Sequence, residues 1–185
     1  MQIKKASYIH GTDIRFRNVE VSDAAFILSL RLDETRNKFI SSVSPSLADQ
    51  ESYLEKYSKS EGEAYFIIEA DHIGPIGTIR LYDQRGSSFC WGSWIVAPGA
   101  PARTGSKSAV LLYIYAFDTL GFSSSHFDVR QGNESVWRFH ERFGAELTHE
   151  DELDRFYTLP RSAWERTKPR YEQYIPSGKL DFKLL

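Results

Sequence analysis

The chain has 185 residues, a formal net charge of −2 at pH 7 and a hydrophobic fraction of 41%, the size and composition of one compact domain. This charge balance gives no basic surface for nucleic acid, and no apolar run approaches the roughly 18 residues of a membrane span. Cys90 is the only cysteine, which excludes an intrachain disulfide and a multi-thiolate metal site. We therefore expect a cytoplasmic protein without nucleic-acid or membrane partners.

The first half of the chain predicts one strand and two helices. Residues 1–12 carry two lysines and no apolar run of signal-peptide length, so we expect a short polar lead-in. Apolar and charged residues alternate from Asp13 to Val19, which predicts a strand with one buried face. Ser22 is the expected N-cap of the first helix, and Ser46 that of a second helix running through ESYLEKY.

The second half predicts a meander followed by mixed elements. Three β-rich runs, AYFIIEA, PIGTIRLYD and SFCWGSWIV, are separated by turn-forming segments and predict antiparallel strands. A long amphipathic helix follows and stops at Gly121. A strand around SHFDVR, a short helix over 133–143 and a β pair over 145–159 complete an α+β layout. We expect one domain over residues 13–160 and a C-terminal extension over 161–185.

The segment RTGSKS, residues 103–108, lies between an apolar strand and the start of the long helix. Free backbone N–H groups and the positive end of the helix dipole converge at such a turn, and small residues let the backbone approach an anion. Arg103 and Lys107 add positive charge. The segment is therefore a candidate phosphate site, and an ordinary helix start with two solvated bases is the alternative.

The second segment of interest is NESVWRFHERFGA. Asn133 is the expected cap of a helix on which Val136, Phe139, His140 and Phe143 share one face, so His140 points inward. A histidine on an apolar face is more often a core residue than a functional one, and both interpretations of His140 stay open.

Taken in this order, the two segments resemble the acetyl-CoA signature of the GNAT acetyltransferase superfamily. Its pyrophosphate loop, Q/R-x-x-G-x-G/A, is matched in position by Arg103, Ser106 and Ser108, with serines in place of the glycines. Its later block, N-x-x-A-x-x-x-Y-E-K-x-G-F, is matched through Asn133, Glu141, Arg142 and Gly144, with His140 at the tyrosine place. The opening RFRNVEVSDAAFILSLR and the FHERFGA block look most like ribosomal-protein N-terminal acetyltransferases and amino-sugar acetyltransferases.

The resemblance implies a GNAT-like fold, a mostly antiparallel mixed sheet flanked by helices, with splayed strands at an acetyl-CoA cleft. It implies direct transfer of an acetyl group from acetyl-CoA to a primary amine, with both substrates bound together. The residues that it implies for binding acetyl-CoA are Ile95, Val96, Arg103, Thr104, Gly105, Ser106, Lys107, Ser108 and Asn133.

The acid and base of the reaction are less defined. Many relatives carry a glutamate on the strand that corresponds to SSFCWGSWIV, and this stretch has no carboxylate. Glu69 on a neighbouring strand is a candidate base, directly or through a water, with a solvent-facing structural role as the alternative. His140 is a candidate acid or base at the thioester. Cys90 is expected to be a small core residue, and no histidine spacing indicates a metal site.

The acceptor site is expected beside the first two helices and the last β pair, which flank the cofactor cleft in the family. Arg31, Asn37 and Phe39 are the candidate acceptor-binding residues. We expect an amine acceptor, either a nucleotide-linked amino sugar or a protein N-terminus. A catalytically silent acyl-CoA-binding module and a plain α+β interaction domain are the alternatives. The 10 tyrosines, 12 phenylalanines and 4 tryptophans also leave a surplus for a homodimer contact.

Overall fold

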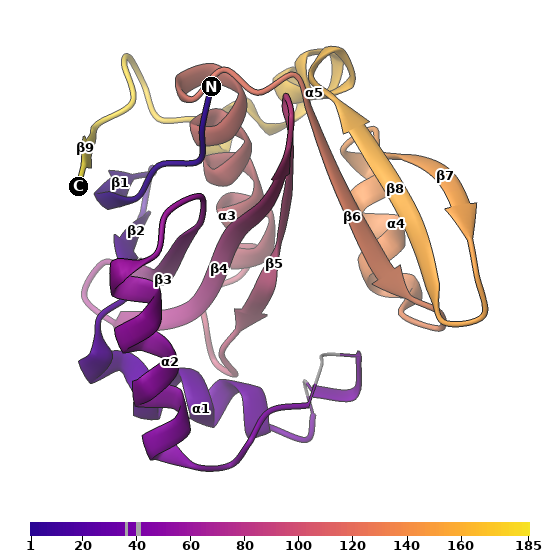
Figure 1. The fold of residues 1–185 in the computed structure, drawn as a ribbon. Helices are drawn as coiled ribbons and strands as arrows, with labels where there is room; N and C mark the ends of the chain where they lie inside the picture. The colour runs from indigo at the N-terminus through magenta and orange to yellow at the C-terminus, as the bar shows by residue number, and fades with distance from the viewer. Residues whose placement is uncertain (36, 40–41) are drawn as a thin grey trace.

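The computed structural model describes residues 1–35, 37–39 and 42–185, and of Asn37 it describes the backbone alone. Within these residues the sheet has nine strands in the order β7-β8-β6-β5-β4-β3-β2-β1-β9 (Figure 1). Neighbouring strands are antiparallel except for the parallel pair β5 and β6. The strands are β1 (Ala6–His10), β2 (Ile14–Asn18), β3 (Ala64–Ala70), β4 (Gly74–Arg85), β5 (Ser88–Val96), β6 (Ser124–Arg130), β7 (Glu146–Glu150), β8 (Asp154–Pro160) and β9 (Phe182–Leu184).

Helices cover both faces of the sheet. Those packed on one face are α3, its π-helical continuation η3, α4 and α5, and those on the other are α1 and α2. Their bounds are η1 (Val21–Asp23), α1 (Ala24–Leu32), η2 (Asn37–Phe39), α2 (Leu47–Lys59), α3 (Thr104–Tyr113), η3 (Ile114–Thr119), α4 (Glu134–Arg142), α5 (Arg161–Thr167) and η4 (Lys168–Tyr174).

Strand β3 is buried along its whole length because it lies between the two helical layers. Phe66 and Ile68 belong to the large cluster beneath α3, whereas Tyr65 and Ile67 belong to the smaller cluster beneath α1 and α2. Successive side chains of a strand point to opposite faces, so one strand supplies both cores. The two cores therefore meet at β3, which lies between them in the middle of the sheet.

Strands β5 and β6 separate soon after they begin. They pair only at Ser88↔Ser124 and Phe89↔Ser125. Beyond this point β5 stays with β4 and β6 stays with β8, so the sheet divides into two halves (Figure 1). A β-bulge bends β5 at Ser93, whose φ is 46°, and its carbonyl accepts a 2.7 Å hydrogen bond from Thr78 Oγ1.

The predicted order of helices and strands is confirmed, including the meander of β3, β4 and β5. Ser46 caps α2 by accepting a 3.2 Å hydrogen bond from the Asp49 amide. The predicted cap at Ser22 is wrong. The helical segment begins earlier, at η1, whose N-cap is Glu20. The Asp23 carboxylate completes a capping box by accepting a 2.8 Å hydrogen bond from the Glu20 amide, while Ser22 is exposed.

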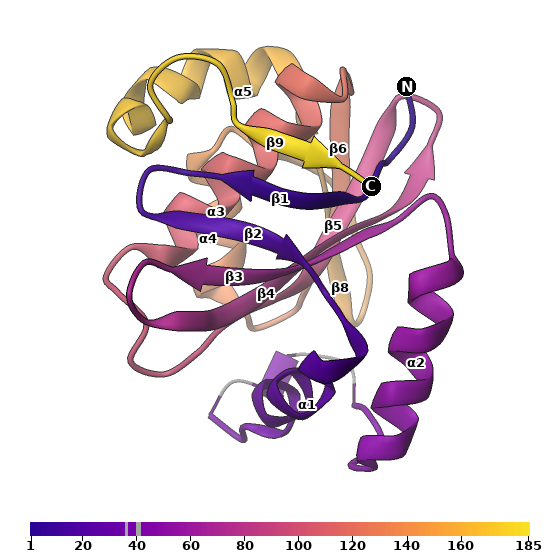
Figure 2. The same ribbon diagram turned by 90° about the vertical axis from the view of Figure 1, so that its left-hand side faces the viewer.

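Both ends of the chain contribute to the sheet. Residues 1–12, expected to be a polar lead-in, contain β1, and residues 161–185 contain α5, η4 and β9. β9 pairs with β1 through Ile9↔Phe182, so the two ends lie side by side at one edge (Figure 2). Trp164 is fully buried in the core. Domain boundaries at residues 13 and 160 stay a prediction.

Candidate active site

Two connected cavities lie where β5 and β6 separate. The larger, of about 660 Å³, follows the end of β5 to the first turn of α3, and the smaller, of about 290 Å³, lies between β5 and β6. Phe39, Trp94, Asn133 and Val136 line both cavities. The two cavities therefore form one continuous cleft.

The free edge of β5 lines this cleft. Beyond Phe89 the edge turned away from β4 has no strand partner among the described residues, and Ile95 and Val96 line the larger cavity. On the other edge Gly77 holds β4 close, because a Cβ there would lie 2.5 Å from the Ile95 carbonyl oxygen. Backbone donors and acceptors of β5 are thus offered to an extended ligand.

The first turn of α3 closes the far end of the larger cavity. Arg103 adopts a left-handed conformation, with φ 68°, at the N-cap, and Thr104 and Gly105 line the cavity. The first hydrogen bond of the helical ladder runs from the Lys107 amide to the Arg103 carbonyl, 3.0 Å away. The amides of Gly105 and Ser106 precede it, so this turn has the geometry of an anion site.

Three side chains of the predicted phosphate loop do not line the larger cavity: Ser106, Lys107 and Ser108. Lys107 forms an ion pair with Asp13. Arg103 Nη1 donates a 2.8 Å hydrogen bond to the Tyr174 hydroxyl, which ties the loop to η4.

Ser108 holds Trp94 in the wall of the cleft. The buried Ser108 hydroxyl accepts a 3.0 Å hydrogen bond from Trp94 Nε1 and donates one of 3.0 Å to the Gly105 carbonyl. A Cβ on Gly105 would lie 3.2 Å from Trp94 Cζ2, so glycine leaves room for the indole. The serine at the third place of the loop therefore supports a cleft residue through its side chain.

His140 lies on the inner face of α4, as predicted from the helical spacing, and lines the smaller cavity. Only 5% of it is exposed, and its ring centroid lies 4.2 Å from that of Phe127 and 5.1 Å from that of Trp91. Burial lowers the pKa of His140 to about 3. The imidazole is therefore neutral at pH 7. It can donate or accept a hydrogen bond, but it is not protonated and so cannot act as a cationic general acid.

Glu69 is not part of the cleft. Its carboxylate pairs with Arg15 Nε at 2.6 Å and Arg17 Nε at 3.0 Å, and it lines neither cavity. Burial alone would raise the pKa of Glu69, but the hydrogen bonds from Arg17 and Arg15 outweigh it and hold the pKa below its usual value. The structure gives Glu69 an ion-pairing role between β2 and β3 in place of the expected base role.

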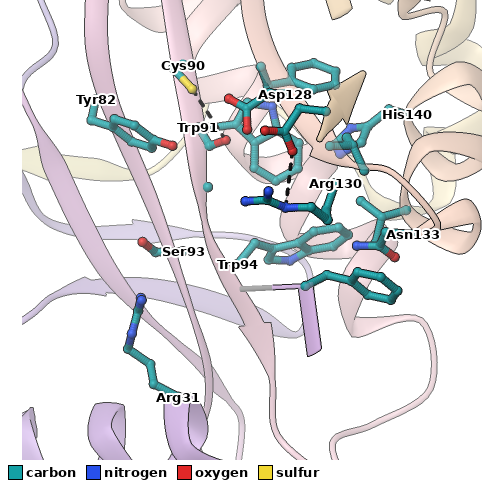
Figure 3. A pocket seen from close by; sticks show the side chains of 16 residues that line it. Arg31, Tyr82, Cys90, Trp91, Ser93, Trp94, Asp128, Arg130, Asn133 and His140 are labelled. Atoms are coloured by element: carbon teal, nitrogen blue, oxygen red, sulfur yellow. Dashed lines mark hydrogen bonds and ion pairs between the residues drawn. The ribbon is translucent and has the colours of Figure 1, made fainter. Parts of the chain in front are cut away.

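The candidate acceptor residues approach the cleft from the α1 side. Arg31, in the last turn of α1, and Phe39 line the smaller cavity. In Figure 3 the Arg31 side chain extends from α1 toward the cavity. The side chain of Asn37 lies outside the described residues.

The sequence did not indicate five polar residues that line the smaller cavity: Tyr82, Ser93, Asp128, Arg130 and Asp154. Asp128 and Arg130 alternate with buried residues along β6, a pattern that is also typical of an ordinary solvated strand face. Arg130 Nε lies 3.3 Å from Asp154 Oδ1, across the β6–β8 pair. Only the cross-strand register brings these groups together.

Cys90 lines the cavity as a buried thiol. Burial raises its pKa to about 11, so it is not a thiolate at neutral pH. Among the described residues no group of three or more His, Cys, Asp or Glu side chains is arranged to hold a metal ion. In the same part of the chain no helix has the length and apolar character needed to cross a membrane.

Comparison with known proteins identifies the family. The model of the acetyltransferase (GNAT) domain matches residues 13–146. The apo structure of FdhC, a nucleotide-linked sugar GNAT, is 35% identical with a TM-score of 0.81, and the alignment covers 95% of this chain and 100% of that chain. No curated protein matches the chain.

More distant structures support the fold alone. A GCN5-related N-acetyltransferase from Brucella melitensis is 19% identical with a TM-score of 0.74, over 92% of this chain and 86% of that chain. A spermidine N-acetyltransferase from Vibrio cholerae in complex with CoA and spermine is 17% identical with a TM-score of 0.72, over 83% and 98%. The expected GNAT-like fold is confirmed, and the chain belongs to the GNAT superfamily of N-acetyltransferases.

Proposed function

We propose that this enzyme transfers an acetyl group from acetyl-CoA directly to the primary amine of a nucleotide-linked amino sugar. The observation that carries the proposal is the continuous cleft, which runs from the first turn of α3 to the separation of β5 and β6. The 35% identity to a nucleotide-linked sugar GNAT supports this class of acceptor.

The larger cavity fits the chemistry of acetyl-CoA. A pyrophosphate would accept hydrogen bonds from the amides of Gly105 and Ser106, near the positive charge of Arg103. The amide groups of a pantetheine arm would pair with the free edge of β5 at Ile95 and Val96. Of the other loop residues, Thr104 closes the turn by donating a hydrogen bond to the Pro101 carbonyl, Lys107 ties it to Asp13, and Ser108 supports Trp94.

The junction of the two cavities is the proposed place of the thioester. Asn133, at the N-cap of α4, and Trp94 line both cavities there. Backbone groups beside the bulge at Ser93 can polarise an acetyl carbonyl. His140 acts in this proposal as a neutral hydrogen-bonding group at the departing sulfur.

The smaller cavity suits an acceptor that carries phosphate. Arg31 and Arg130 both line it, and arginine binds phosphate oxygens through a rigid fork of N–H donors. Phe39 supplies an apolar surface for a sugar or a base. Asn37 completes the proposed acceptor set on the strength of the sequence alone.

The proposal is tested by following thiol release from acetyl-CoA with nucleotide-linked amino sugars, free amino sugars, peptides, polyamines and aminoglycosides. We expect nucleotide-linked amino sugars to give the highest kcat/KM, because the arginines add binding that a free sugar cannot use. A higher kcat/KM for peptides would instead indicate a protein N-terminal acetyltransferase. Binding of acetyl-CoA without thiol release for any acceptor class would favour a silent acyl-CoA-binding module.

The proposed setting is the cytoplasm, since the one cysteine is a free thiol, as expected of a protein in a reducing compartment. A homodimer stays a prediction from the aromatic content.

A further inference from the structure

We propose that Asp128 is the general base that removes the proton from the acceptor amine, an inference that rests on the proposed function. The β5 segment from Ser88 to Val96 has no carboxylate, so the base must come from another element that lines the cleft. Asp128 reaches the cleft from β6, the opposite wall (Figure 3).

The register of β5 and β6 places Asp128 level with the β-bulge at Ser93. The last paired residues of the two parallel strands are Phe89 on β5 and Ser125 on β6. Because parallel strands rise by the same amount per residue, three further steps bring Asp128 level with Gly92, next to Ser93. The two strands have separated there, so the carboxylate borders open space between them.

The face of β6 that carries Asp128 is open to an acceptor. His126 precedes it on this face and binds the Ser88 hydroxyl through Nδ1 at 2.7 Å, just above the separation. Phe127 and Val129 point to the opposite, buried face. Asp128 is therefore the first carboxylate below the junction of the two strands on the acceptor side.

Asp128 has no hydrogen bond or ion pair within the described part of the chain, whereas the other carboxylate of the cavity, Asp154, lies against Arg130. Asp154 and Arg130 face each other across β8 and β6, so this pair can hold the arginine toward the acceptor. Of the two carboxylates that line this cavity among the described residues, that of Asp128 is therefore left to receive a proton.

Other titratable groups of the cavity do not suit this step. Burial lowers the pKa of His140 to about 3, which makes its neutral imidazole a weak base. Burial raises the pKa of Cys90 to about 11 and that of Tyr82 above its usual range, so both stay protonated. The charged or titratable groups that line this cavity with Asp128 or share its face of β6 are Tyr82 on β4, Cys90 on β5, His126 and Arg130 on β6, Asp154 on β8, His140 on α4 and Arg31 on α1.

The proton and electron balance is complete without any further reactant. The acceptor nitrogen forms a C–N bond with the acetyl carbon, the C–S bond breaks, and its electron pair leaves with sulfur. An ammonium nitrogen loses two protons in becoming an amide. One passes to Asp128, directly or through a water, and then to solvent, and the other goes to the departing sulfur.

The test compares wild type with Asp128→Asn, using acetyl-CoA and a nucleoside-diphosphate-linked amino sugar. At pH 7 we expect kcat/KM to fall by about 10²–10⁴-fold, with the acetyl-CoA Kd and the melting temperature unchanged. The fall in kcat/KM of Asp128→Asn should become smaller as the pH rises through the pKa of the acceptor amine, because the amine has then already lost this proton to solvent. Glu51→Gln, which removes an exposed carboxylate of α2, is the charge-matched control and keeps the wild-type profile.

Chemical rescue provides a second readout that a structural role would not move. Added formate should restore part of the rate of Asp128→Gly, because a small carboxylate can occupy the vacated space. A pH-independent loss without rescue, or a wild-type rate in Asp128→Asn, would overturn the inference. If wild type binds acetyl-CoA but acetylates no acceptor, the proposed function itself fails, and the assignment of Asp128 fails with it.

Discussion

His140 lines the cleft and is surrounded by aromatic rings. Its ring lies close to those of Phe127, Trp91 and Phe139, and burial lowers its pKa to about 3. The unfolded chain takes up a proton below a pKa of about 6.5, whereas the folded chain does so only near pH 3. Between these values the unfolded state binds more protons, so the free energy of unfolding falls as the pH falls.

We predict that wild type loses more stability between pH 7 and pH 5 than His140→Phe does. The difference should reach up to about 1.4 kcal/mol for each pH unit below 6.5, because phenylalanine has no proton to take up. Urea denaturation of both proteins at the two pH values measures it. Equal losses would mean that His140 titrates normally and that its surroundings are hydrated.

Single residues differ in how far the sequence could predict them. The inward position of His140 follows from helical spacing, which is local. The partners of Glu69 do not, because the alignment of Arg15 with Glu69 depends on the register of β2 and β3. For the same reason the sequence offered no ground to choose Asp128, whose height opposite Gly92 depends on where β5 and β6 pair.

At the scale of elements, the start of α3 separates two cations that look equivalent in RTGSKS. Arg103 lines the larger cavity, whereas Lys107 forms an ion pair with Asp13, which lies just before β2. The sequence could predict the anion-binding turn, since strand, small residues and helix follow in order. It could not predict that one cation binds a neighbouring segment, or that Ser108 supports Trp94.

We predict that Arg103→Glu raises the acetyl-CoA Kd by about tenfold or more without lowering the melting temperature, since 1.4 kcal/mol suffices for that factor. Lys107→Glu should instead lower the free energy of unfolding by about 1 kcal/mol, because it sets a carboxylate against Asp13. Calorimetric binding and urea denaturation measure the two effects.

The reversed pair Asp13→Lys with Lys107→Glu should recover the stability, and Lys179→Glu, a charge reversal elsewhere on the surface, is the control. The assignment of separate roles fails if Lys107→Glu weakens binding as strongly as Arg103→Glu while the protein stays equally stable.

For the molecule as a whole, the cleft results from one incomplete pairing in a nine-stranded sheet. The order of elements and the antiparallel meander follow from local patterns and turns. The separation of β5 from β6 does not, because parallel pairing joins segments that are distant in sequence. The joining of the chain ends through β1 and β9 is likewise non-local. β9 has only three residues, and the burial pattern of β1 does not alternate.

A crystal structure of the complex with CoA would locate the donor relative to both halves of the sheet. We predict pyrophosphate oxygens within about 3 Å of the Gly105 and Ser106 amides, the pantetheine arm along β5 at Ile95 and Val96, and the sulfur beside Trp94. CoA bound outside the cleft where β5 and β6 separate, or with its pyrophosphate away from the first turn of α3, would show that the proposed donor site is wrong.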